Sequence, residues 1–230
     1  MYDIMILLVD AANRTLFATD IGAMHRQRKT IFVDRAGWKV SVIAGQEIDR
    51  FDLLEHTRYL LAKDEPHGPV LASARLLTTS GPHLMQELYS VAHPVALPCG
   101  PGIWEASRFC TSPEIVGRNR RLSLLWEIIC GVMETALTHG IDQVIFAANR
   151  ALLPLSLHCG WEARIVGPTQ KDGEDEFTAV AASITAHGLC TVRERHGVPA
   201  PIIFRTDGRH GSEAIPPPAN AHPLEDARPP

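Results

Sequence analysis

The sequence lacks the features that mark membrane-spanning, secreted and zinc-binding proteins. It has no run of about 18 apolar residues and no basic segment followed by an apolar run and a cleavage site, so we expect neither a membrane span nor a secretory leader. Its five cysteines include no CxxC pair, which argues against a zinc site or a disulfide framework and fits reduced thiols. These absences predict a soluble, cytoplasmic protein without a bound metal.

The chain also lacks an excess of basic residues and any internal repeat. Its 22 Lys and Arg residues stand against 26 Asp and Glu residues, so nothing favours bulk binding of nucleic acid, and we expect a small or local partner. With 45% hydrophobic residues the chain can bury the core of one α/β domain, which we place at residues 1–210. Residues 211–230 contain six prolines and few large apolar residues, so we predict a disordered tail there.

Apolar periodicity predicts strands that alternate with helices. The expected strands are 4–9, 58–62, 70–77, 103–110, 143–148, 161–166 and 176–184. The expected helices are 14–32, 120–139 and 151–159, the first capped by Asn13 and the second ended by Gly140. This order predicts a hairpin from the second and third strands and a β-α-β unit near the C-terminal half.

A set of ionisable and aromatic residues is spread over the first half of the chain, mostly beside apolar neighbours. Its members are Arg28, Phe32, Trp38, Asp49, Asp52, Arg75, Glu105 and Arg108. A buried charge is expensive unless an opposite charge compensates it, so we expect these residues to line one polar pocket. Two simpler interpretations stay open: a solvated helix end for Arg28 and a solvated acidic face for residues 47–52.

Two local patterns add detail to that pocket. Glu105 and Arg108 have opposite parity on their strand, so they can share a site only across a bulge or at a strand end, and we predict a bulge. A glycine and three arginines precede the long helix: Gly117, Arg118, Arg120 and Arg121. Helix amides, the helix dipole and guanidinium groups favour a phosphate at such a place, although a solvated basic turn fits as well.

Taken in order, these residues resemble the autoinducer synthases, the family of enzymes that make N-acyl-homoserine lactones. The resemblance spans roughly residues 14–167 and rests on Arg28-Lys29-Thr30-Ile31-Phe32 with Trp38, Glu47-Ile48-Asp49-Arg50-Phe51-Asp52, Ala74-Arg75-Leu76 and Trp104-Glu105-Ala106-Ser107-Arg108-Phe109. Tyr89 departs from the pattern, since family members typically carry Phe there, and the proline-rich tail lies outside it. The resemblance implies an α/β, acetyltransferase-like three-layer fold, with a twisted mixed sheet, a V-shaped cleft and helices on both faces.

The resemblance also implies the reaction. An acyl group passes from an acyl thioester, carried on acyl carrier protein or coenzyme A, to the amine of S-adenosylmethionine. Lactonisation then releases methylthioadenosine and a quorum-sensing signal. No further cofactor and no nucleic-acid or membrane partner is expected.

Roles follow for the residues that match the family motif. Glu105, Ser107 and Arg108 are the expected catalytic residues, with Glu105 taking the amine proton directly or through one water. Backbone N–H groups of a bulge near 103–107 are expected to hold the oxyanion. For the substrate we assign Asp49 and Asp52 to the cationic groups, Arg28 or Arg108 to the carboxylate, Phe32 and Trp38 to the adenine or the sulfonium, and Arg75 to a bridge between the acidic loop and the sheet.

The acyl chain requires an apolar tunnel, which we expect between the long helix and the strand 143–148. In the family a threonine on this strand tends to accompany 3-oxo acyl chains. The nearest position here is Phe146, so we expect a chain without a 3-oxo group. Arg118, Arg120 and Arg121 suit either an acidic carrier protein or the phosphates of coenzyme A.

Three alternatives stay open at this point. An acetyltransferase-fold N-acyltransferase would use acyl-CoA on a different amine, although residues 117–121 hold one glycine rather than a glycine-rich turn. A non-catalytic module would only sense S-adenosylmethionine or a fatty-acyl carrier. As a separate alternative, the charged residues form only an ion-pair lattice that holds the N-terminal lobe closed.

Overall fold

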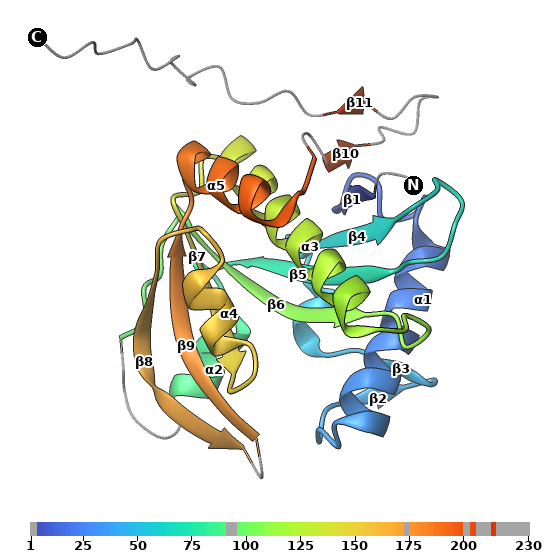
Figure 1. The fold of residues 1–230 in the computed structure, drawn as a ribbon. Coiled ribbons are helices and arrows are strands. Elements are labelled where there is room, and N and C mark those ends of the chain that lie inside the picture. Colours follow the sequence, from blue (N-terminus) through green and yellow to red (C-terminus); the bar gives the residue numbers. More distant parts are fainter. Residues whose placement is uncertain (1–3, 91–95, 173–174, 200–202, 206–212, 215–230) are drawn as a thin grey trace, which may run out of the picture.

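A nine-stranded mixed sheet runs through the computed structural model, which describes residues 4–90, 96–172, 175–199, 203–205 and 213–214 (Figure 1). Its strand order is β11-β10-β1-β4-β5-β6-β7-β9-β8. The strands are β1 (Met5–Val9), β4 (Arg58–Lys63), β5 (Ala72–Thr78), β6 (Ile103–Thr111), β7 (Gln143–Asn149), β8 (Ala163–Asp172), β9 (Asp175–Ser183), β10 (Ile203–Arg205) and β11 (Glu213–Ala214), with a separate hairpin of β2 (Val42–Ile43) and β3 (Gln46–Glu47). The helices are α1 (Ala18–Arg28), the π-helix η1 (Lys29–Arg35), the 3-10 helix η2 (Arg50–Leu53), α2 (Leu84–Ser90), α3 (Arg118–Thr138), α4 (Leu153–His158) and α5 (Ala186–His196).

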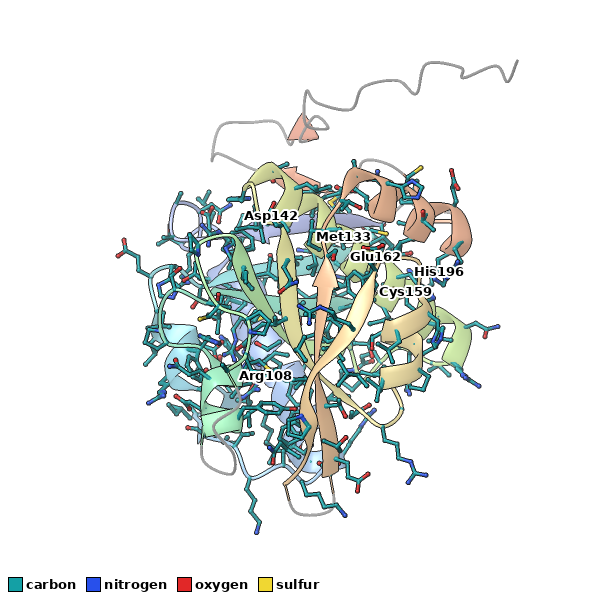
Figure 2. All side chains as sticks on the ribbon, turned by 90° about the vertical axis from the view of Figure 1, so that its left-hand side faces the viewer. Arg108, Met133, Asp142, Cys159, Glu162 and His196 are labelled. Carbon is teal, nitrogen blue, oxygen red and sulfur yellow. The ribbon has the colours of Figure 1, made fainter. Side chains whose placement is uncertain are left out.

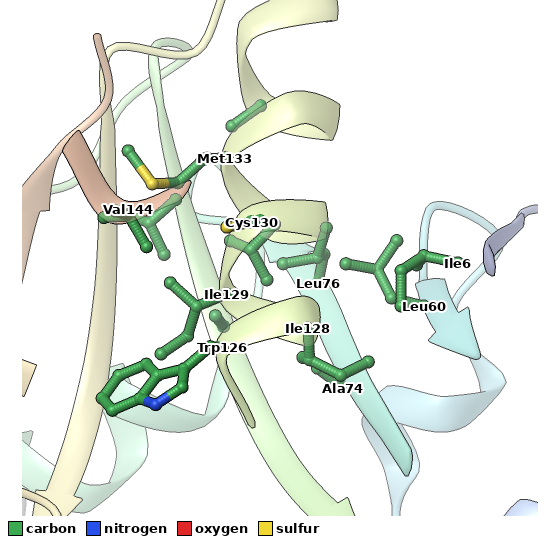
Figure 3. Close-up of a cluster of buried hydrophobic side chains, with 14 of the residues drawn as sticks. Ile6, Leu60, Ala74, Leu76, Trp126, Ile128, Ile129, Cys130, Met133 and Val144 are labelled. Carbon is green, nitrogen blue, oxygen red and sulfur yellow. The ribbon is translucent and has the colours of Figure 1, made fainter. Parts of the chain in front are cut away.

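Helices cover both faces of this sheet, as the three-layer prediction required. In Figure 1, α3, α4 and α5 lie in front of the strands, and α1 and α2 lie behind them. Alternation along each strand separates two cores: on β4, Leu60 packs towards α3 whereas Leu61 packs towards α1. Figure 3 shows the α3 core, in which Ile128 lies beside Ala74.

The sheet opens between its two central strands. Parallel pairing of β6 with β7 covers only Ile103 to Glu105, although both strands continue well beyond that point. In Figure 2, Arg108 on β6 lies away from Asp142, which precedes the paired end of β7. The separation of the two strands forms the V-shaped cleft of the predicted fold.

The predicted bulge lies within β6. Ser73 of β5 pairs with Cys110, but Arg75 pairs with Ser107, so two residues of β6 oppose one residue of β5. Arg108 takes a positive φ of 55° there. The bulge is therefore confirmed, but it lies at Arg108 and the residue after it, beyond the stretch 103–107 in which we expected it to supply an oxyanion hole.

Most predicted elements are present within a few residues, including the β4–β5 hairpin and the long helix. Gly140 ends α3 as predicted: its φ is 66°, its N–H bonds Leu137, and the N–H of Ile141 bonds Ala136. The predicted start of the first helix was wrong. It begins at Ala18, because the Asn13 side chain bonds Leu8 and Asp10 instead of capping a helix.

The connections in the second half differ in part from the prediction. The adjacent parallel strands of a β-α-β unit are β6 and β7, joined by α3. The short helix α4 joins β7 to β8, and β9 lies between those two strands. Of the predicted tail, Glu213–Ala214 pair as β11 with β10, and the other residues of 211–230 lie outside the described residues.

Candidate active site

A compensated ion network lies on the α1 face of the sheet and begins with Arg28. This side chain is 0% exposed, and all three of its nitrogens donate to carboxylates. Nε donates to Glu47 Oε2 at 2.5 Å, and Nη1 and Nη2 each donate to one oxygen of Asp52 at 2.9 Å. The solvated-end interpretation of Arg28 is therefore wrong, because the buried guanidinium is paired on all sides.

Two further arginines complete the network. Arg75 Nη1 donates to Asp49 at 2.6 Å and to Asp52 at 3.1 Å, and its Nε donates to Ser107 Oγ at 3.2 Å. Arg108 Nη2 donates to Asp49 at 2.9 Å.

Arg108 also reaches Glu47, with its Nη2 at 3.1 Å from Oε1. The cluster therefore holds three guanidinium groups, those of Arg28, Arg75 and Arg108, and three carboxylates, those of Glu47, Asp49 and Asp52. Their formal charges cancel, which is the condition for placing so many ions out of water.

The acidic loop is held in place by its own backbone. Asp49 accepts hydrogen bonds from the N–H groups of Phe51 and Asp52, and the Asp52 side chain accepts one from the N–H of Asp49. This reciprocal capping box starts η2 and fixes both carboxylates toward the arginines. The carboxylates of Glu47, Asp49 and Asp52 therefore belong to the ion network and do not form a solvated acidic face.

Burial and pairing change the acidity of two groups in the network. Burial raises the pKa of Asp52, but the hydrogen bonds and charge of Arg28 outweigh it and hold that pKa well below its usual value. Burial and the Asp52 charge raise the pKa of Tyr59, whose hydroxyl donates to Asp52 at 3.0 Å. Asp52 thus stays ionised and Tyr59 stays neutral at physiological pH.

Glu105 is the one carboxyl group of the predicted site that no arginine neutralises. It is 0% exposed, its Oε2 accepts the backbone N–H of Met85 at 2.7 Å, and its buried Oε1 has no hydrogen-bond partner among the described residues. Burial raises its pKa, against the opposing effects of the Met85 amide, the Arg75 charge and the nearby Ser107 hydroxyl. A carboxyl group with raised pKa and a free oxygen is suited to accept a proton.

The two aromatic residues of the predicted site lie together at the edge of the network. Phe32 and Trp38 stack with ring centroids 4.7 Å apart and planes 7° apart. The guanidinium of Arg108 lies 5.9 Å from the centroid of Phe32. One face of each ring is thus covered by the other ring, and Trp38 is half-buried and partly open to a ligand.

An apolar cavity of about 390 Å³ lies beside the end of β6 and the start of α3. Its lining includes Phe109, Leu124, Leu125, Ile128 and Leu152, together with Gly117, Arg118 and Arg121 at the helix start. Arg120 is not part of this lining, and its Nη1 lies 3.9 Å from Glu127. The lining thus combines apolar side chains with two arginines at the start of α3.

Phe146 does not line this cavity. It points to the α3 side of the sheet, opposite to Glu105, and packs on Trp161 with ring centroids 5.7 Å apart. The side chains of Phe146 and Trp161 therefore occupy the space in which we expected the tunnel. Residues of α3 line the cavity as expected, but residues of β7 do not.

Sequence reasoning missed four contributors to the site. Glu47 was noticed only as part of an acidic run, yet it is 0% exposed and links two arginines. Tyr59, the backbone of Met85 and His25 were not considered. His25 Nδ1 lies 2.8 Å from the carbonyl oxygen of Glu47. Glu47 is the first residue of the acidic run that contains Asp49 and Asp52. Its spacing from these two residues could have indicated that it belongs to the same site.

The fold and this site together define an acyltransferase of the acetyltransferase-like class. The fold alone is shared with a protein from Lactobacillus plantarum assigned as an N-acetyltransferase, at a TM-score of 0.53 and 17% identity over 80% of this chain and 99% of that one. The chain belongs to the autoinducer synthase family, whose model matches residues 13–190. The predicted family and its reaction class, acyl transfer in the synthesis of acyl-homoserine lactones, are confirmed.

Individual relatives agree with this assignment. The acyl-homoserine-lactone synthase of Agrobacterium fabrum is 30% identical over 187 residues, which cover 80% of this chain and 84% of that protein. The structure of BjaI, a CoA-dependent acyl-homoserine lactone synthase, with MTA matches at a TM-score of 0.77 and 30% identity over 88% of this chain and 93% of that one. BjaI with SAM and isopentyl-CoA matches at a TM-score of 0.75.

Within the described residues, no group of three or more His, Cys, Asp or Glu side chains could hold a metal ion. No helix in the described part of the chain is both long and apolar enough to cross a membrane.

Proposed function

We propose that the ion network binds S-adenosylmethionine and that Glu105 deprotonates its amine. The observation that carries the proposal is a contrast between six mutually paired ions and one buried carboxyl group, that of Glu105. Its Oε1 has no hydrogen-bond partner among the residues that the structure describes. A substrate with both signs of charge fits beside such a network, and its amine requires a base. BjaI, solved with SAM, is the relative that supports this choice of substrate.

Exposure divides the network into contact residues and supporting residues. The Asp49 side chain is 16% exposed and that of Arg108 is 7% exposed, whereas Arg28, Glu47 and Asp52 are exposed by 1% or less. Asp49 therefore suits the ammonium or sulfonium, Arg108 suits the carboxylate, and Trp38 offers a face to the adenine. The buried members hold these groups in place, as we expected for Arg75.

The reaction then needs few protein groups. Glu105 takes a proton from the ammonium, and the amine attacks the thioester carbonyl. Beyond Glu105 the N–H groups on the open edge of β6 are not paired with β7, so they are suited to hold the oxyanion. The substrate carboxylate finally attacks its own γ-carbon and a neutral thioether leaves, a step that depends on positioning.

The apolar cavity is our candidate for the acyl donor. Phe109 and the leucines of α3 suit an acyl-pantetheine chain, and the start of α3 with Arg118 and Arg121 suits phosphate. The similarity to BjaI favours acyl-CoA over acyl carrier protein, and a cytoplasmic location suits both donors. Rates with the same acyl chain on both donors test this choice, and higher kcat/KM with the carrier protein would reverse it.

The central experiment measures product and binding separately. Purified protein with S-adenosylmethionine and acyl-CoA is expected to form acyl-homoserine lactone and methylthioadenosine, identified by mass spectrometry. Glu105→Gln is expected to lower kcat by about 10² to 10⁴ and to retain S-adenosylmethionine binding in calorimetry. Glu127→Gln, an isosteric change at another buried carboxyl group, is the matched control and should keep wild-type activity. Full activity in Glu105→Gln would refute the assignment of the base.

A further inference from the structure

One edge of the sheet joins a strand near the N-terminus to strands near the C-terminus. β1 pairs in parallel with β10, with Ile6 opposite Ile203 and Leu7 opposite Phe204, and β11 pairs with β10 in turn. Figure 1 shows β10 and β11 beside β1, away from the cleft. Both β1 and β10 lie outside residues 13–190, which the family model matches. This edge of the sheet is therefore built by segments outside the family match.

The opposite edge of the sheet is formed by β8, which has the features of a protected edge strand. It contains Pro168, and its register with β9 shifts between Ile165 and Thr169. It ends in the charged residues Lys171 and Asp172. Proline, bulges and charges on an edge strand hinder the addition of a strand from another chain. β8 can therefore face solvent without pairing.

β1 has none of these features. Its sequence is Met5-Ile6-Leu7-Leu8-Val9, without a proline or a charge, and its pairing with β4 is regular over all five residues. Ile6 and Val9, which point to opposite faces of the sheet, are both 0% exposed. A regular apolar strand whose second edge is free presents a row of N–H and C=O groups to any further strand. β1 therefore requires a cover, and β10 supplies it.

Glu134 of α3 holds this cover in place. Its Oε2 accepts the backbone N–H of Ile203 at 3.0 Å, and its Oε1 pairs with Arg193 of α5. The Ile203 side chain is 0% exposed, and a Cβ added to Gly131 of α3 would lie 3.3 Å from Ile203 Cδ1 and 3.1 Å from Ile6 Cγ2. Because only two residues of β10 pair with β1, these contacts outside the ladder are needed to keep β10 on the sheet.

We propose that β10 covers a self-association edge and that Glu134 is its latch. When β10 leaves, the freed edge of β1 pairs with the same edge of a second copy of this chain, about a two-fold axis. Neither proposed variant below changes a residue of the ion network, so the proposal does not depend on the proposed reaction.

The sequence of β1 selects a second copy as the partner because it is complementary to itself. In an antiparallel register centred on Leu7, Ile6 faces Leu8 and Met5 faces Val9 of the other copy. Ile6 and Leu8 belong to the α3 core, whereas Leu7 and Val9 belong to the α1 core, so both faces of the joined sheets match. Every cross-strand pair in this register is apolar, and such pairs stabilise a sheet.

Two full-length variants test the cover. Ile203→Asp places a charge at a fully buried position and should expel β10, whereas Glu134→Gln keeps the shape of the latch and removes its charge. Light scattering after size exclusion should give the mass of one chain for wild type, and a mass that rises to two chains with concentration for Ile203→Asp. In Glu134→Gln, amide hydrogen exchange in peptides covering residues 4–9 should be about tenfold faster. The control, Ile165→Asp, makes the same change on β8 at a residue that is 53% exposed, and should match wild type in both measurements.

Hydrogen exchange also identifies the surface through which the copies associate. For Ile203→Asp, exchange of residues 4–9 should be slower at high than at low protein concentration, because a second copy then replaces β10. Association with exchange that does not depend on concentration would mean that another surface is used, and would overturn the proposal. An Ile203→Asp variant that is less stable but keeps the mass of wild type would also overturn it, because β10 would then only pack against the core. If Ile203→Asp fails to fold, wild-type exchange of residues 4–9 in Glu134→Gln decides against the latch and the cover.

Discussion

Replacing Glu47 by Gln tests whether the ion network is balanced as tightly as its geometry indicates. The side chain is fully buried, accepts Arg28 Nε at 2.5 Å and accepts Arg108 through Nε and Nη2 at 3.2 and 3.1 Å. Gln keeps the shape but removes the charge, which leaves three guanidinium groups against two carboxylates. Breaking a buried ion pair in this way costs about 3 to 5 kcal/mol.

For a chain of this size, about 2 to 4 °C of melting temperature are lost per kcal/mol, so we expect Glu47→Gln to melt roughly 6 to 20 °C lower. Thermal and urea unfolding followed by circular dichroism measure the change. The control is Glu176→Gln, which breaks the exposed pair with Lys171 and should cost less than about 1 kcal/mol. The reasoning would be refuted if Glu47→Gln cost no more than this control.

The double variant Glu47→Gln/Arg108→Gln extends the same test. It restores equal numbers of the two charges, because one guanidinium is removed with the carboxylate it touches. If the cost of Glu47→Gln arises from an unpaired buried charge, the double variant should be more stable than the sum of the two single variants predicts. Strict additivity would mean that the cost of Glu47→Gln does not arise from leaving the Arg108 charge unpaired.

Three shorter predictions concern other parts of the molecule. The raised pKa of Glu105 means that folding favours its protonated form, so the protein loses stability as the pH rises through the folded-state pKa. Glu105→Gln cannot ionise, so it should melt at a higher temperature than wild type at pH 8 and at the same temperature at pH 4. Gly131→Ala should cost about 1 to 3 kcal/mol in urea unfolding, because a Cβ there would lie 3.1 Å from Ile6 Cγ2. Mass spectrometry of the products should show mainly acyl chains without a 3-oxo group, and Phe146→Thr, which opens space against Trp161, should accept 3-oxo donors better than wild type.

Sequence periodicity was sufficient to predict the helices and strands whose local apolar pattern agrees with their environment in the fold. The helix α3 has both an apolar face and a Gly140 that can take positive φ, so its end could be predicted to within two residues. The hairpin of β4 and β5 likewise follows from two apolar runs joined by a turn-rich segment. At Asn13 the same kind of reasoning was wrong, because a short polar side chain serves a turn as readily as a helix cap.

The site was harder to predict than the fold because its contacts join distant parts of the chain. That Arg28 needs a carboxylate follows from its apolar surroundings, but the choice of Glu47 and Asp52 depends on how α1 packs against β3 and η2. The Met85 N–H on Glu105 could not be foreseen, since no periodic pattern indicated α2. Backbone donors carry no side-chain signal in a sequence.

The bulge at Arg108 links the chemistry of the site to the geometry of the sheet. A non-glycine residue at φ 55° costs roughly 1 to 3 kcal/mol, and regular pairing with β5 would avoid that cost. Regular pairing would also turn the Arg108 side chain to the opposite face from Glu105, because successive residues of a strand alternate. The bulge instead brings Arg108 to the face that holds Glu47 and Asp49, and those ion pairs offset the strain. The same irregularity comes after the last residue of β6 that pairs with β7, so one local distortion both places a substrate-binding charge and accompanies the opening of the cleft.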